Sequence, residues 1–283
     1  MATARAIRRK VANGAFIVFC TLAAVIAVGV LALILYSLLK NGLGGLNLDI
    51  FTMDTPAPGS RGGLRNAIVG SVMLCAFAMV IAIVIGILSG TWLAEYGGDS
   101  AYAKLIRFVN DILLSAPSIL VGLFVYQMAL FVNRQHAFSG VSGAVALSLL
   151  AIPVITRTTE DMLKLQPSSL RESGVALGTP IWITIRKIMW RSASAGLVTG
   201  ALLAFARISG ETAPLLFTAF GNQFFNLDMT KKIASLPQVI YNDALSAYDD
   251  LNRLAWVGAI LITFAVLATQ IIARIVIRGN RGS

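Results

Sequence analysis

Long uncharged stretches alternate with short polar segments along most of this chain. The uncharged stretches are residues 11–39, 67–94, 112–133, 137–156 and 254–273. Each has about the 20 residues that a helix needs to cross a membrane. Residues 196–220 form a further apolar stretch that holds only two charges. The pattern predicts six transmembrane helices: the first over 11–39 and the others at about 67–94, 109–132, 138–156, 196–220 and 254–277.

Composition supports a membrane location and excludes an ordinary soluble protein. Hydrophobic residues make up 57% of the chain and charged residues 13%, with a mean hydropathy of +0.79. Soluble domains average about 25% charged residues. The first apolar stretch exceeds the 7 to 15 residues of a signal-peptide core by a wide margin, so we expect a retained anchor. The fold class is therefore an all-α integral membrane protein. Cys20 and Cys75 both lie in predicted spans and predict packing groups rather than a disulfide framework.

The net charge of +10 is explained by where the basic residues stand. With six alternating spans, fifteen of the 23 Lys and Arg residues lie on one side, together with both termini, and seven on the other. Basic loops face the cytoplasm in membrane proteins, so both termini are expected there. Membrane lipid is then the natural partner of this basic surface, and nucleic acid is not expected.

The loops divide the chain into two parts. Residues 1–62 comprise a cytoplasmic amino terminus, the first helix and an external linker rich in Gly and Pro, and residues 63–283 form the main transmembrane domain. Within that domain, residues 157–195 are the one long polar connector on the cytoplasmic side. Gly178 and Pro180 predict a turn in it, between a first short helix and a second one on which Ile181, Ile185 and Ile188 recur at helical spacing.

Arg207 and Glu211 are the leading candidates for a functional site. A charge at bilayer depth costs about 2.5 to 3.5 kcal/mol on insertion scales, and such groups usually face a bundle interior or a water-filled path. We expect both residues to line a substrate path, with the nearby hydroxyls of Ser209 and Thr212. A purely structural bridge between the two charges is the alternative.

Four helix-breaking residues should shape that path. Gly210 and Pro214 predict a kink or break beside the charged pair, because Pro cannot donate a backbone hydrogen bond and Gly is a poor helix former. If the helix restarts near Thr212, freed amides would add partial positive charge. Pro117 and Pro153 predict further kinks. Kinks that serve packing alone are the alternative.

Catalytic and metal-binding signals are weak. No Gly-Lys-Ser/Thr ending of a nucleotide-binding P-loop occurs in the sequence, so we expect no ATP hydrolysis by this chain through that motif. His136 is the only histidine and lies in a short external loop, which gives little support for a metal or acid–base site. We therefore expect no enzyme activity, no bound cofactor and no metal.

The polar connector resembles the coupling loop of bacterial ABC importer permeases. The family pattern has Glu, then Gly six residues later and Ile ten residues after that, and here these are Glu172, Gly178 and Ile188. The chain departs from the pattern at Ser173-Gly174, where the family has two alanines, and at Trp190-Arg191, where it has Leu-Pro. The resemblance implies a type I (MetI-like) permease core whose connector contacts an ATPase.

A closer resemblance, to the phosphate permease subunits of the PstA family, runs from residue 62 to 242. It rests on Gly62-Gly-Leu-Arg-Asn-Ala-Ile-Val-Gly-Ser71, Leu93-Ala-Glu-Tyr-Gly97, Ala116-Pro-Ser-Ile119, Pro153-Val-Ile-Thr-Arg157 and Gly210-Glu-Thr-Ala-Pro-Leu-Leu-Phe217. It implies an importer of inorganic phosphate in the bacterial plasma membrane. The implied partners are a second homologous permease, two copies of a cytoplasmic ATPase that uses ATP and Mg, and an external phosphate-binding protein. It also makes Arg157 a second path candidate, although Arg157 is equally well explained as a basic anchor at a helix end.

Other functions stay open at this point. A permease for sulfate, molybdate or phosphonate is the nearest alternative. A secondary anion transporter is less favoured, because the chain lacks the paired half-repeats common in such folds. Glu211 has two interpretations: a bridge to Arg207 when the path is empty, or an acceptor for the proton that hydrogen phosphate carries and sulfate lacks.

Overall fold

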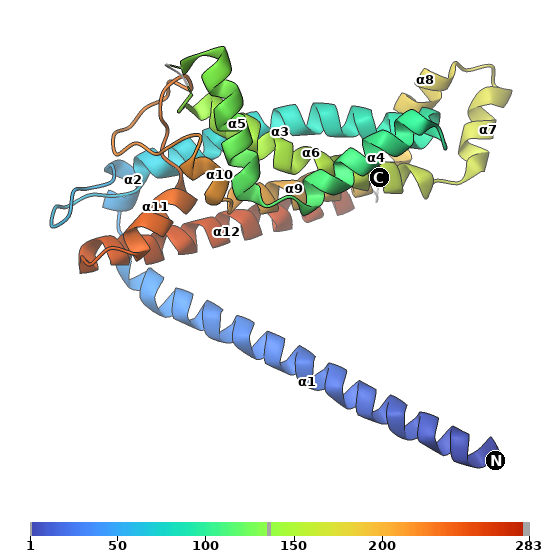
Figure 1. Ribbon diagram of the computed structural model, residues 1–283, viewed down its shortest axis with the longest axis horizontal. Coiled ribbons are helices and arrows are strands. Elements are labelled where there is room, and N and C mark those ends of the chain that lie inside the picture. The colour runs from blue at the N-terminus through green and yellow to red at the C-terminus, as the bar shows by residue number, and fades with distance from the viewer. Residues whose placement is uncertain (1, 135–136, 280–283) are drawn as a thin grey trace.

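Helices make up most of the computed structural model, which describes residues 2–134 and 137–279. The long ones are α1 (Ala2–Gly42), α3 (Arg65–Trp92), α6 (Gly140–Lys164), α9 (Trp190–Ser209) and α12 (Asp249–Gly279) (Figure 1). Within the described residues, five helical segments are long and apolar enough to cross a membrane, and a bent pair of helices could make a sixth. This confirms the predicted all-α membrane fold.

Shorter elements connect the long helices. They are η1 (Leu43–Gly45), α2 (Asp49–Thr52), η2 (Leu93–Gly97, a π-helix), α4 (Ala101–Ser115), α5 (Ser118–Val132), α7 (Ser168–Ala176), α8 (Ile181–Thr184), η4 (Ile185–Met189, also a π-helix), α10 (Ala213–Leu216) and α11 (Leu236–Ala244). His136 lies outside the described residues.

Small residues on one face of α3 allow it to pack closely against α6. Ala78, Ala82, Gly86 and Gly90 recur every four residues and are all buried. A Cβ added at Gly86 would lie 2.7 Å from the Cβ of Ile155, and one at Gly90 would lie 2.5 Å from the carbonyl oxygen of Thr156. Membrane helices associate through such small-residue faces, because lipid supplies no hydrophobic drive for their association.

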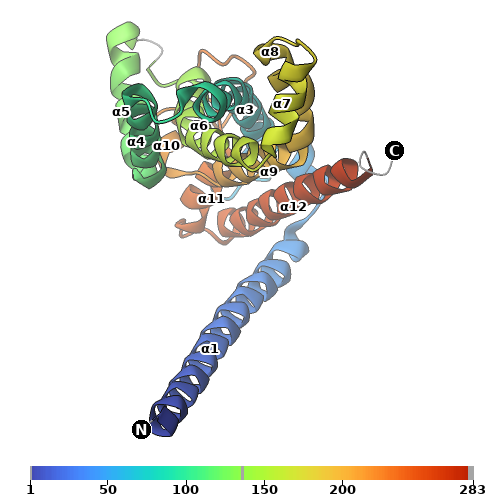
Figure 2. The ribbon, with the colours of Figure 1, turned by 90° about the vertical axis from the view of Figure 1, so that its right-hand side faces the viewer.

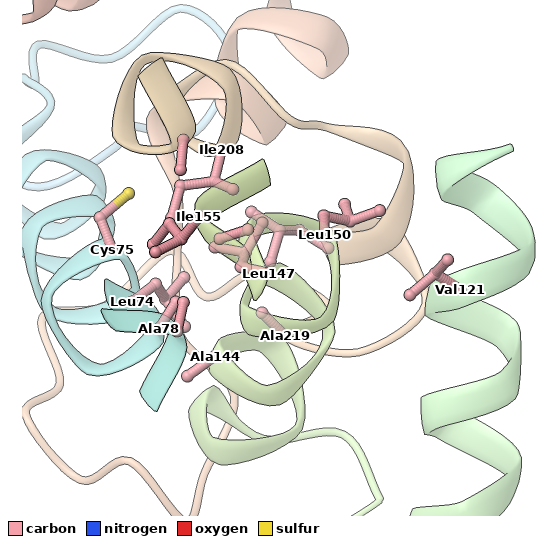
Figure 3. Close-up of a cluster of buried hydrophobic side chains, with 14 of the residues drawn as sticks. Leu74, Cys75, Ala78, Val121, Ala144, Leu147, Leu150, Ile155, Ile208 and Ala219 are labelled. Carbon is pink, nitrogen blue, oxygen red and sulfur yellow. The ribbon is translucent and has the colours of Figure 1, made fainter. Parts of the chain in front are cut away.

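The main apolar core lies where α3, α6 and α9 meet. Leu74 comes from α3, Leu147, Leu150 and Ile155 from α6, and Ile208 from α9, and all five are almost fully buried (Figure 3). This core fixes the end of α9 against the middle of the other two helices.

The first helix, α1, runs away from the rest of the molecule (Figures 1 and 2). Its apolar window has a mean hydropathy of 3.0, and none of that window is buried. Its end and the following turn η1 touch the body, where Gly42 of α1 packs on Ile260 and Gly45 of η1 on Val257 of α12. The start of α1 and the end of α12 both lie toward the end of the long axis that carries α7 and α8 (Figure 1).

The structure differs from the sequence prediction over 109–132. Instead of one continuous helix, α4 and α5 meet at an elbow of 110°. The elbow lies at Ala116 and Pro117, where both residues have extended backbone conformations. A residue before proline is driven out of the helical region, so the predicted kink at Pro117 is a full corner.

The helix predicted over 138–156 extends further than expected. α6 continues without a break through Pro153 and on to Lys164. Its apolar window is 72% buried, so packing against its neighbours outweighs the one backbone hydrogen bond that Pro153 removes. Arg157 therefore lies on the same helix as Pro153 and not in a loop.

Candidate substrate path and coupling loop

The helix α9 stops well inside the depth of the membrane domain. The hydroxyl of Ser209, its last residue, lies 4.0 Å from the sulfur of Cys75 on α3. Cys75 is ten residues from the start of α3 and seventeen from its end. At 1.5 Å per residue, α9 ends about 15 Å from one end of α3. The predicted helix over 196–220 is thus interrupted near mid-depth.

Arg207 and Glu211 lie at this interruption. Arg207 is in the last turn of α9, and its Nε is 3.9 Å from Oε1 of Glu211. The two side chains are 34% and 18% exposed. The distance is within ion-pair range but too long for a hydrogen bond. A last-turn position also suits a cation, because the carbonyl end of a helix carries partial negative charge.

The backbone between α9 and α10 turns tightly. The amides of Gly210 and Glu211 donate to the carbonyls of Arg207 and Ile208, at 3.4 and 3.3 Å. Thr212 is the N-cap of α10, and Pro214 stands in its first turn. The break lies where Gly210 and Pro214 predict it. The new helix has only four residues, too few for the sustained dipole at a helix start that the sequence suggested.

The other path candidates take different positions. Ser209 donates to the carbonyl of Phe205 at 2.7 Å and lies beside Cys75, so its hydroxyl is already engaged. Arg157 pairs with Asp161 at 3.3 Å, and both side chains are about half exposed. Thr158 packs against Gly200 of α9, seven residues before Arg207, so Arg157 lies about 10 Å from the level of the pair.

The connector contains the predicted helix–turn–helix. Glu172 is exposed on α7, Gly178 has a φ of +66°, and Ile188 is half-buried in η4. Residues other than Gly rarely adopt that positive φ, which explains the Gly at this position. A Cβ on Gly174 would collide with the side chain of Thr184, so the close packing of α7 on α8 accounts for Gly in place of alanine there.

Sequence reasoning missed two buried carboxylates near this connector. The side chains of Glu95 and Glu160 are 6% and 3% exposed. Arg171 pairs with Glu95 at 2.7 Å, and Arg107 pairs with Glu160 at 2.7 Å. For Glu95 the available signal was an acidic residue directly after an apolar stretch, but a sequence does not show which distant Arg it meets.

At the opposite end of α3, a buried amide ties separate loops together. The side chain of Asn66 accepts hydrogen bonds from the amide and hydroxyl of Thr55 at 3.1 and 3.0 Å. It donates to the carbonyls of Asn222 and Gln223 at 2.8 and 3.1 Å. Both ends of α3 are therefore held by side-chain contacts to segments distant in sequence.

Comparison with known proteins assigns this arrangement to a class of transporter. Residues 82–282 match the family described as binding-protein-dependent transport system inner membrane component. The fold is similar to that of a chain of the methionine ABC transporter MetNI in an inward-facing conformation. That similarity has a TM-score of 0.60 and 22% identity, and covers 76% of this chain and 95% of the other. The chain belongs to the family of binding-protein-dependent transport system inner membrane components, and is a multi-pass protein of the plasma membrane.

Within this family the chain is similar to the phosphate transport system permease protein PstA of several bacteria. It is 49% identical to PstA of Haemophilus influenzae, over 94% of this chain and 94% of that protein. It is 48% identical to PstA of Xylella fastidiosa, over 97% and 95%. For PstA of Yersinia pestis the identity is 51%, over 86% and 82%.

Proposed function

We propose that this chain is the permease subunit of an ATP-driven importer that carries inorganic phosphate across the bacterial plasma membrane. The observation that carries the proposal is the Arg207–Glu211 pair, which lies at mid-depth beside a broken helix. Similarity to PstA proteins over nearly the whole chain supports phosphate as the substrate.

Phosphate needs a cation at this depth. Moving the mono- or dianion through hydrocarbon unpaired would cost on the order of tens of kcal/mol. A guanidinium lowers that barrier, because its planar fork fits two phosphate oxygens and it stays charged when desolvated. Since Arg207 is not hydrogen-bonded to Glu211 at 3.9 Å, its donors can turn to a passing anion without first breaking a short bond.

Glu211 would limit and select what Arg207 binds. Conduction requires binding that is weak enough to allow release, and a carboxylate beside the guanidinium weakens an anion's hold. The carboxylate oxygens of Glu211 can also accept a hydrogen bond from the hydroxyl group of hydrogen phosphate. Sulfate has no such proton, so the same carboxylate would repel it.

The partners follow from the same proposal. A second homologous permease would complete the path, two copies of a cytoplasmic ATPase would use ATP and Mg, and an external binding protein would deliver phosphate. The ATPase would bind at α7 and α8, where Glu172, Val175, Leu177 and Trp182 are exposed. Exposed apolar groups clustered on a polar connector are typical of a protein-binding surface.

Uptake by the complete complex in vesicles tests the proposal. With ATP on the ATPase side and binding protein on the other, phosphate should enter and sulfate should not. Arg207→Ala should lower phosphate uptake at least about tenfold, since a hydrogen bond to a charged group contributes about 1.5 to 3 kcal/mol. Glu211→Gln should lower the ratio of phosphate to sulfate uptake.

Lys104→Ala, which removes an exposed charge on α4, serves as the control and should leave uptake unchanged. Near-normal phosphate uptake by Arg207→Ala would contradict the path role of Arg207. An unchanged phosphate-to-sulfate ratio in Glu211→Gln would remove the selective role of Glu211. Uptake of sulfate in place of phosphate by the unaltered complex would favour the other oxyanion permeases.

A further inference from the structure

The end of α3 nearest the connector unwinds into the π-helix η2, and a side chain of α4 holds it. Arg107 donates from Nη2 to the carbonyl of Leu93 at 3.2 Å and from Nη1 to that of Gly98 at 2.9 Å. Its Nε donates to Glu160 of α6 at 2.7 Å. π-Helical turns are rare and frequently mark functional sites. One guanidinium thus joins both ends of η2 to α6.

A second guanidinium joins η2 to the connector. Arg171 of α7 donates from Nε to Oε2 of Glu95 at 2.8 Å and from Nη2 to Oε1 at 2.7 Å. It also donates to the carbonyls of Gln166 and Leu163, at 3.1 and 2.9 Å. Two parallel bonds to a carboxylate fix both distance and angle, unlike a single point contact. Glu95, the middle residue of η2, is 6% exposed, whereas Arg171 is 31% exposed, so the carboxylate is shielded from solvent and the guanidinium only partly.

The Arg171–Glu95 pair lies between the connector and the helices of the membrane domain. α7 packs against α8 and η4, and its Leu170 contacts the apolar cluster of Leu163, Met189, Ala193 and Leu197. Those contacts link α7 to α6 and α9. Arg171 adds a direct ion pair from α7 to η2, the continuation of α3, and α3 packs along α6.

We propose that Arg171 and Glu95 form a rigid link that transmits movement of the α7–α8 connector to the inner end of α3. The inference rests on the proposed function, in which a partner ATPase moves this connector. Both residues are positioning residues, since neither lies at the Arg207–Glu211 site. Without the link, movement of the connector would reach the inner end of α3 only indirectly, through α6 and α9, and α3 would follow it poorly. ATP would then be hydrolysed with little phosphate carried.

The test measures phosphate carried per ATP hydrolysed, using the complete complex in vesicles. Removing one partner leaves a buried charge and can unfold the protein, so both are replaced together. In a background of Cys20→Ser and Cys75→Ser, the variant Glu95→Cys with Arg171→Cys should retain ATP hydrolysis but carry at least about tenfold less phosphate per ATP. A short bifunctional thiol crosslinker should then restore the ratio.

The control is the ion pair, at 2.8 Å, between Asp49, the first residue of α2, and Arg61, in the linker between α2 and α3. Both residues are changed to Cys in the same way. In this control variant, the phosphate carried per ATP hydrolysed should equal that of the unaltered complex, with or without the crosslinker. An unchanged ratio in the Glu95–Arg171 variant would overturn the proposal. So would a lowered ratio that the crosslinker fails to restore, because that indicates a merely structural pair. Failure of the unaltered complex to carry phosphate would instead contradict the proposed function.

Discussion

Asp243 is a carboxylate that the fold largely buries. It lies on α11 and is 8% exposed. Among the described residues, neither its Oδ2 nor the Oε1 of neighbouring Gln238 has a hydrogen-bond donor. Burial raises the pKa of the Asp243 carboxyl from 3.8 to about 6, and the charge of Asp250 adds to the effect. Folding therefore favours the protonated form.

This pKa shift predicts that Asp243 weakens the fold above about pH 6. Because its folded pKa is raised, the folded state gains stability from the proton below pH 4 and loses it as pH rises to about 6. Asp243→Asn mimics the protonated form, so it should stabilise the protein at pH 8 by up to about 3 kcal/mol and have little effect at pH 4. Thermal unfolding in detergent at the two pH values measures this. The exposed Asp99→Asn should show no such difference, and an equal effect of Asp243→Asn at both values would refute the assignment.

The candidate site was only partly predictable at the residue scale. Depth and spacing in the sequence were enough to select Arg207 and Glu211 and to predict the break at Gly210 and Pro214. They did not show that Arg207 would stand in a last helical turn, because a helix end depends on what packs around it. The pairing of Glu95 with Arg171 was not predictable either, since it depends on a contact between residues 76 apart in sequence.

Among the elements, the α3–α6 pair shows how little space a membrane helix interface leaves. Gly86 and Gly90 let the two backbones approach, and at Gly90 an added Cβ would press on the carbonyl of Thr156, which cannot move like a flexible side chain. The sequence contains this Gly spacing, but single-sequence patterns do not show which helix it faces. The α4–α5 elbow was likewise predicted only as a kink, because its angle depends on tertiary packing.

Gly90→Ala should therefore destabilise the fold by about 1 to 3 kcal/mol, the usual cost of overpacking. The midpoint of thermal unfolding in detergent measures the change. Gly29→Ala on α1, where an added Cβ meets nothing within 4 Å, is the matched control and should not lower the midpoint. An equal effect of the two substitutions would show that the α3–α6 contact is looser than the structure indicates.

Taken as a whole, the molecule has polar elements at both ends of an apolar body. Hydropathy alone predicted the all-α class and nearly all of the spans, because crossing a membrane imposes length and composition on each helix. The relative placement of α1, which stands apart from the body, was beyond sequence reasoning, since its apolar surface is compatible with any direction (Figure 2).

The side of the membrane on which each end lies can be measured directly. The distribution of Lys and Arg predicts that α7 faces the cytoplasm and the linker before α3 faces outward. In a background of Cys20→Ser and Cys75→Ser, an impermeant thiol reagent added to intact cells should label Ser60→Cys. The same reagent should label Ser169→Cys only after the membrane has been permeabilised. The reverse pattern would invert the topology.

The contacts at the start of α3 also have a consequence for biosynthesis. Asn66 binds the carbonyl of a residue 156 positions later, and the amide of Gly59, in the linker just before α3, binds Asp250, 191 positions later. The segment that forms α3 is synthesised early. The polar groups at its start can meet these partners only after most of the chain has been synthesised. Until then α3 lies in the membrane without the later residues that bind its first turn. A chain that stops before residue 222 would lack both carbonyls to which the Asn66 side chain donates.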